Sequence, residues 1–137
     1  MKKLSIKQRV YPSFLNYNGD VFGGWIVSQM DSACGVAVEE IVTTRAVTAS
    51  ISKIEFLQPV QNGNIISVYT DIIKIGRTSI TINVDVVVID HMTNEEKVVT
   101  DAEFVFVCID DGGKPIAVKD VLKDPISEDI KRMINES

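Results

Sequence analysis

Histidine, cysteine and an excess of positive charge are what this 137-residue sequence has least of. Its one histidine, His91, and its two cysteines, Cys34 and Cys108, lie far apart and form no CxxC pair, so no structural zinc site is expected. Fourteen basic residues face nineteen acidic residues, for a formal charge of −5. This balance disfavours sequence-independent binding to nucleic acid, which needs a basic surface.

Long apolar runs are also missing. Lys7, Gln8 and Arg9 interrupt the N-terminal segment, and no stretch reaches the roughly 18 apolar residues of a membrane-spanning helix. We therefore expect a cytoplasmic protein with no membrane insertion. Hydrophobic residues at 45% and charged residues at 24% are typical of one globular domain, and we find no repeat or linker that divides the chain.

The pattern of apolar residues predicts one long helix followed by strands. Residues 22 to about 42 carry apolar side chains at spacings of three and four, after a run of turn-forming residues at 16–20. Strands are predicted over 4–11, 47–56 with a bulge near Lys53, 65–75, 80–88 and 98–109, and a short helix over 127–134 with Ser127 as N-cap. This order favours an antiparallel sheet with a mostly buried long helix on one face, and an exposed sheet edge that favours self-association.

Asp31 is an unusual residue for its place in the predicted helix. It lies four residues after Val27 and three before Cys34, on the apolar stripe, where a carboxylate is costly unless it is hydrogen-bonded or wet. Asp31 is either a structural residue, satisfied by a backbone group or a threonine hydroxyl, or a general base or nucleophile.

The predicted helix begins with the glycine-rich sequence GDVFGG at residues 19–24. Amide N–H groups at a helix start have no intrahelical partner and can stabilise an oxyanion, although such glycines can also serve only as a packing turn. Asp31 lies about two turns after Gly24, roughly 10 Å along the axis at about 1.5 Å per residue. Both groups reach one substrate only if it lies along the helix or if a second chain contributes.

A second polar cluster, KIGRTS at residues 74–79, combines two cations, a glycine and two hydroxyls. It can bind phosphate groups, although a solvated hairpin turn is the more frequent explanation. Cys34 and Cys108 are expected to be core thiols, because His91 lies in a polar loop and is expected to be exposed.

The sequence NGDVFGGWIVSQMD at residues 18–31 resembles the helix-opening signature of YciA-like acyl-CoA thioesterases of the hotdog superfamily. The resemblance continues through 56–60 and 76–80, and weakly through 101–107, so it covers about residues 10–115. It implies an α+β hotdog fold, in which an antiparallel sheet wraps one long central helix. Residues 1–137 would form a single hotdog domain, with a core over about 5–115 and a C-terminal tail whose short helix spans about 127–134. It also implies a homo-oligomer with a dimer as the minimum unit, and most often a hexamer arranged as a trimer of dimers.

The activity implied by this resemblance is hydrolysis of acyl-CoA to a free carboxylic acid and CoA. Asp31 would be the catalytic carboxylate, the amides of Gly23 and Gly24 would polarise the thioester carbonyl, and Asp20 would lie beside the acyl group. The resemblance places CoA near the 76–79 turn, with the binding set Asn18, Lys74, Gly76, Arg77, Thr78 and Ser79. It implies no metal and no cofactor, since CoA enters as part of the substrate and leaves as product.

Several alternatives stay open at the level of sequence. Asp31 can activate water or attack the thioester itself to form an anhydride, and the sequence SACG at 32–35 departs from the family pattern, which leaves the acyl chain length undecided. A hotdog dehydratase or hydratase would use a histidine, which the helix start lacks. A non-catalytic acyl-CoA or nucleotide sensor, with Asp31 purely structural, is the other alternative.

Overall fold

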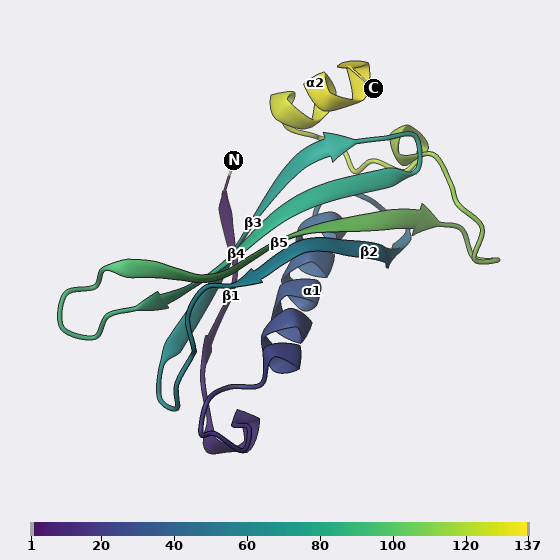
Figure 1. Ribbon diagram of the computed structural model, residues 1–137. Helices are drawn as coiled ribbons and strands as arrows, with labels where there is room; N and C mark the ends of the chain where they lie inside the picture. Colours follow the sequence, from purple (N-terminus) through teal and green to yellow (C-terminus); the bar gives the residue numbers. More distant parts are fainter. Residues whose placement is uncertain (1, 137) are drawn as a thin grey trace.

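The computed structural model describes residues 2–136 and contains a curved five-stranded antiparallel sheet with a long helix against its concave face (Figure 1). The strands are β1 (Lys3–Arg9), β2 (Arg45–Phe56), β3 (Ile65–Ile75), β4 (Ser79–Ile89) and β5 (Glu96–Ile109). The helices are α1 (Gly23–Glu39) and α2 (Glu128–Glu136), with 3-10 turns η1 (Pro12–Phe14) and η2 (Val118–Asp120). The predicted order of strand, helix and four strands is confirmed.

The strand order in the sheet is β1-β3-β4-β5-β2, so β4 is central and β1 and β2 form the edges. The core lies between α1 and the sheet. Side chains of β4 such as Ile80, Ile82 and Val84 are fully buried, whereas none of the twelve described residues of β2 is buried. The edge strand β2 is therefore open to solvent in the single chain.

Irregularities in β2 fall partly where the sequence predicts them. Lys53 has a φ of 55°, and the pairing with β5 shifts between Ser52 and Glu55, which confirms the predicted bulge. A second shift, between Thr48 and Ser50, is not visible in the alternation of side chains. Over this shift β2 advances by two residues and β5 by one, which is the pattern of a β-bulge.

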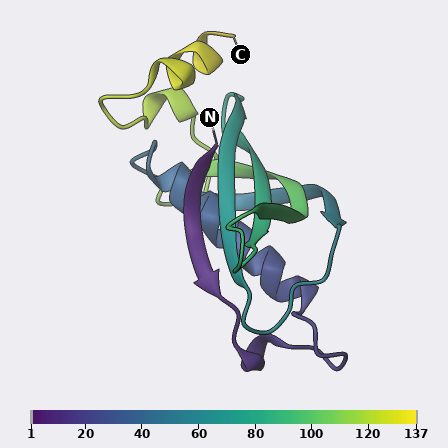
Figure 2. The ribbon, with the colours of Figure 1, turned by 90° about the vertical axis from the view of Figure 1, so that its left-hand side faces the viewer.

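Helix α1 ends at Glu39, three residues before the predicted end, and it is not mostly buried. Its buried side is formed by Ile26, Met30, Ala33, Cys34, Ala37 and Val38. The sheet curves around this side only (Figure 2). Ser28, Ser32 and Val36, on the other side of the helix, are exposed. The prediction of a mostly buried helix is wrong for the single chain, because the sheet covers only one side of α1.

The C-terminal segment folds back onto the end of the sheet. The amide N–H of Ile130 donates to Ser127 Oγ at 3.2 Å, which confirms Ser127 as the N-cap of α2. Ile130 is buried, and Met133 and Ile134 pack against the core beside it. In Figure 1, α2 lies beyond the end of β3, close to the turn that connects β3 to β4. Over residues 2–136, neither helix combines the length and the apolar character that a membrane span requires.

Candidate active site

Asp31 lies in the middle of α1, half-buried at the border between its buried and exposed sides. The spacing of apolar residues placed Asp31 on the apolar stripe of the helix. In the structure the buried side is centred on Met30, Cys34 and Val38, and Asp31 lies beside it. Thr48 Oγ1 of β2 donates a hydrogen bond to Asp31 Oδ1 at 2.5 Å. One carboxylate oxygen is therefore held by a hydroxyl, and the carboxylate is neither isolated in the core nor fully solvated.

Sequence reasoning considered a threonine hydroxyl as a partner of Asp31 but did not identify Thr48. The two residues are 17 positions apart, and the irregular pairing between Thr48 and Ser50 helps to set the direction of the Thr48 side chain. The only signal in the sequence is the alternation of hydroxyl residues at Thr48, Ser50 and Ser52, which by itself does not select one of them.

An open groove of about 410 Å³ lies directly beside this pair. Ser32, Gly35 and Val36 of α1 form one wall, and Ala46 and Val47 of β2 form the other. Because β2 is an edge strand, the groove faces the uncovered side of the molecule. A ligand or a second protein chain can therefore reach the Asp31 carboxylate and the Thr48 hydroxyl.

The start of α1 provides backbone donors. Phe22 is the N-cap residue, and its carbonyl accepts hydrogen bonds from the amides of Trp25 and Ile26. Within residues 2–136, the amides of Gly23 and Gly24 donate to no protein acceptor. A Cβ at Gly23 would lie 3.2 Å from the Phe56 ring, whereas one at Gly24 would meet no atom within 4 Å. Gly24 is thus the more accessible of the two predicted oxyanion donors.

Asp20 and Asn18 lie in the loop before α1, which Asn16 organises. The Asn16 side-chain oxygen accepts hydrogen bonds from the amides of Asn18, at 2.9 Å, and Asp20, at 3.2 Å. Gly19, between them, has a φ of +83°, a conformation that favours glycine. Asp20 is half-buried and forms an isolated bridge with Gln61. Asn16 is a positioning residue that sequence reasoning grouped only with the turn formers.

One chain does not bring the predicted catalytic groups into a single cavity. Among the residues that the structure describes, the groove beside Asp31 includes neither Gly23 nor Gly24 nor Asp20. Strand β2 runs along the whole helix, with Thr48 at Asp31 and Phe56 at Gly23. The helix start and the groove beside Asp31 are therefore separate places, which the exposed side of α1 and strand β2 connect. The separation of about two helical turns between Gly24 and Asp31 predicted that they would be apart.

The predicted phosphate-binding turn connects β3 to β4. The Gly76 amide donates to the Ser79 carbonyl at 2.8 Å, and a Cβ at Gly76 would lie 2.6 Å from Ser79 Oγ. A pocket of about 310 Å³ adjoins the turn and is lined by Ile75, Gly76, Arg77, Lys119 and Ile134. Lys74, Thr78 and Ser79 lie outside this lining. Sequence reasoning missed Lys119 and Ile134, which come from the C-terminal segment.

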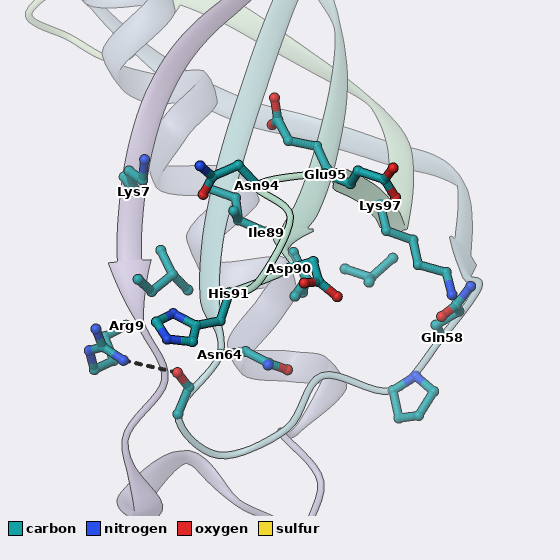
Figure 3. A pocket seen from close by; sticks show the side chains of 16 residues that line it. Lys7, Arg9, Gln58, Asn64, Ile89, Asp90, His91, Asn94, Glu95 and Lys97 are labelled. Carbon is teal, nitrogen blue, oxygen red and sulfur yellow. Dashed lines mark hydrogen bonds between the residues drawn. The ribbon is translucent and has the colours of Figure 1, made fainter.

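A larger cavity, about 970 Å³, lies elsewhere, between the end of β1, the loop before β3 and the β4–β5 hairpin (Figure 3). Its lining mixes cations such as Lys7 and Arg9 with Asp90 and Glu95, and it holds none of the predicted site residues. His91 is exposed in this hairpin loop, as expected. The amides of Met92 and Thr93 lower the pKa of Asp90, so this carboxylate stabilises its own loop.

The two cysteines provide no nucleophile. Cys34 and Cys108 are fully buried free thiols. Burial raises the pKa of both, and the Asp31 carboxylate raises the pKa of Cys34 further. Both residues are core thiols, as predicted.

Known proteins resemble this chain in sequence and in structure. Residues 18–94 match the Thioesterase superfamily. The acyl-CoA thioester hydrolase YciA of Salmonella typhimurium is 36% identical over 116 residues, which cover 82% of this chain and 87% of that protein. The Thioesterase superfamily match covers both the glycine-rich helix start and Asp31.

Solved structures give the same result for the fold. The hexameric broad specificity acyl-coenzyme A thioesterase HI0827, in a form with an aspartate replaced by alanine, superposes with a TM-score of 0.84 and 31% identity, covering 98% of this chain and 96% of that chain. Cj0915, a hexameric hotdog fold thioesterase of Campylobacter jejuni, gives a TM-score of 0.77 and 36% identity over 94% and 93% of the two chains. The expected hotdog fold is confirmed, and the chain belongs to the Thioesterase superfamily, among the YciA-like acyl-CoA thioester hydrolases.

Proposed function

We propose that this chain hydrolyses acyl-CoA thioesters to a carboxylic acid and CoA, with Asp31 as general base or nucleophile. The observation that carries the proposal is the hydrogen bond between Asp31 and Thr48 on an open groove. Asp31 lies in α1, and the start of the same helix has amide donors that no protein group uses. The similarity to YciA of Salmonella typhimurium, an acyl-CoA thioester hydrolase, supports the same chemistry.

The residues suggest how the reaction proceeds. Thr48 holds Asp31 Oδ1, so the other carboxylate oxygen is available to take a proton from water or to attack the thioester carbonyl. The amides of Gly24 and Gly23 then donate to the oxyanion, an interaction typically worth about 3 to 4 kcal/mol per donor. Collapse of the tetrahedral intermediate breaks the C–S bond and releases the CoA thiolate, which needs no strong general acid. In the nucleophilic route, water then hydrolyses the Asp31–acyl anhydride, which releases the carboxylic acid and restores the Asp31 carboxylate. The proposal includes no metal and no cofactor.

A second copy of the chain completes this site in our proposal. The exposed side of α1 carries small residues such as Gly24, Ser28 and Ser32, and the adjacent edge strand β2 exposes Val47, Ile51 and Phe56. An unpaired edge beside an apolar surface favours pairing with another copy. The resulting dimer would bring the helix start of one subunit toward Asp31 of the other. The hexamers formed by HI0827 and Cj0915 support further assembly into a hexamer.

The remaining predicted roles fit the same substrate. Arg77 and the backbone of the Gly76 turn would bind the phosphates of CoA, and Asp20 would lie beside the acyl group. Lys74, Thr78 and Ser79 lie outside the pocket at this turn, so their roles, and that of Asn18, stay predictions. Because the substrate is an intracellular thioester, the proposal retains a cytoplasmic location.

Two other functions are less well supported. A dehydratase or hydratase needs a histidine at the reacting carbon, but His91 lies in the exposed β4–β5 loop and lines a different cavity. A sensor that binds acyl-CoA without hydrolysis shares the fold and the nucleotide site. It differs from the enzyme only in turnover.

The test is a hydrolysis assay on a panel of acyl-CoA substrates, in which a thiol-reactive dye detects released CoA. We expect turnover by the wild-type chain and a loss of at least about two orders of magnitude in Asp31→Asn, which keeps the shape of the side chain but removes its charge. Glu40→Gln is the matched control, because it neutralises an exposed carboxylate immediately after α1. Absence of turnover in the wild-type chain would favour the sensor, and full activity of Asp31→Asn would remove Asp31 from the mechanism.

A further inference from the structure

We propose that the C-terminal segment supplies half of the nucleotide site, with Lys119 of η2 binding a phosphate and Ile134 of α2 contacting the base of a phosphorylated adenosine. This inference rests on the proposed function, because it assigns the nucleotide end of CoA to the pocket at the Gly76 turn. It adds two residues from a part of the chain that lies 40 or more positions beyond the turn.

Backbone hydrogen bonds hold this segment against the turn. The amide of Cys108 donates to the Thr78 carbonyl at 2.9 Å, and the amide of Ile116 donates to the Cys108 carbonyl at 2.9 Å. The amide of Val118 then donates to the Arg77 carbonyl at 2.8 Å. Lys119 therefore follows directly after a residue that is bonded to Arg77, and its position relative to the turn is fixed by the fold.

The charges at this pocket are uncompensated. Within residues 2–136, no acidic side chain forms an ion pair with Arg77 or Lys119. The acidic residues at the start of α2 are paired within the helix, Glu128 with Lys131 and Asp129 with Arg132. In a protein with a formal charge of −5, two unpaired cations at one pocket form a local site for an anion.

The pocket also has an apolar wall. Ile75 is buried beneath it, and Ile134 lines it from α2, which buried Ile130 anchors to the core. A volume of about 310 Å³ is at the lower end of the range for ligand pockets, so it suits one nucleoside end and not a whole CoA molecule. Cations that flank an apolar surface match a ligand that joins phosphates to a flat, weakly polar base.

The pocket shares no lining residue with the groove beside Asp31, so binding there should affect the ground state and the transition state equally. Loss of Lys119 should therefore raise the KM for acyl-CoA and leave kcat unchanged. The rise should be about two- to fivefold, as for loss of a single exposed charge contact, and should diminish at high salt. Thioesters that lack the nucleotide should not respond.

The experiment compares Lys119→Ala with Lys114→Ala, a control that removes the same charge from the exposed turn before the pocket segment. Calorimetry measures binding of 3′-phosphoadenosine 5′-diphosphate and of inorganic pyrophosphate to each intact oligomer. Kinetics measure KM and kcat for acyl-CoA and for the matching acyl-N-acetylcysteamine thioester. A third variant, Ile134→Ala, is checked by thermal unfolding and should weaken the adenosine probe while leaving pyrophosphate unchanged.

We expect Lys119→Ala alone to weaken both probes and to raise the KM for acyl-CoA. The inference is overturned if Lys114→Ala has the same effect, or if Lys119→Ala binds both probes like the wild type. It is also overturned if Lys119→Ala impairs hydrolysis of the nucleotide-free thioester equally. Because probe binding requires no turnover, a chain that binds the nucleotide through Lys119 but hydrolyses no thioester would refute the proposed function and not the site.

Discussion

Replacing Thr48 with valine tests how the fold controls Asp31. Valine keeps the branched shape of threonine but lacks the hydroxyl that donates to Asp31 Oδ1 at 2.5 Å. Hydrogen bonds to charged groups contribute about 1.5–3 kcal/mol, and the exposed position of Thr48 favours the lower end of that range. About 1.4 kcal/mol corresponds to a factor of ten in rate, so kcat should fall about tenfold.

The division between kcat and KM identifies the role of this hydroxyl. Thr48 lies beside the reacting carboxylate and does not line the nucleotide pocket, so KM should change by less than about twofold. Thr48→Ser keeps the hydroxyl and should retain kcat within about threefold of the wild type. Thermal unfolding of Thr48→Ser should match the wild type, whereas Thr48→Val should unfold at a slightly lower temperature, because it loses the hydrogen bond to Asp31.

The assay is the release of CoA from one acyl-CoA substrate at saturating concentration, followed with a thiol-reactive dye. Wild-type kcat in Thr48→Val would show that the hydrogen bond does not orient Asp31 for catalysis. An equal loss in Thr48→Ser and Thr48→Val would show that the methyl group or the local backbone matters and not the hydroxyl.

Three further predictions concern the nucleotide turn, the core and the assembly. Arg77→Ala should raise the KM for acyl-CoA several-fold in steady-state kinetics with little change in kcat, and an equal loss with nucleotide-free thioesters would refute phosphate binding. The pKa of the Cys34 thiol is raised in the folded protein, so above pH 9.0, the ordinary thiol value, only the unfolded chain loses this proton. The free energy of unfolding, measured with urea, should therefore fall as the pH rises above that value. It should fall less steeply in Cys34→Ala. An equal slope in that variant would exclude Cys34 as the source. Light scattering at micromolar concentration should show a dimer or a larger oligomer, and a monomer would contradict a shared active site.

Local sequence was sufficient to predict most of the secondary structure. Alternation of apolar and polar residues predicted β4, and spacings of three and four predicted α1, because these periods follow directly from backbone geometry. The bulge at Lys53 and the cap at Ser127 are likewise determined within a few residues. Asp31 and the glycine-rich helix start were also identified from sequence, since a carboxylate and glycines are unusual beside an apolar stripe.

The partners of these residues were decided only by the tertiary structure. Thr48 meets Asp31 across 17 positions, and Lys119 reaches the Gly76 turn from more than 40 positions away. Contacts of this kind depend on strand register, on an irregularity such as the one between Thr48 and Ser50, and on how the C-terminal segment packs. The exposed side of α1 is a further example, because spacing shows which helix residues are apolar but not how far the sheet curves around them. Those features result from the packing of the whole chain, and no local period in the sequence encodes them.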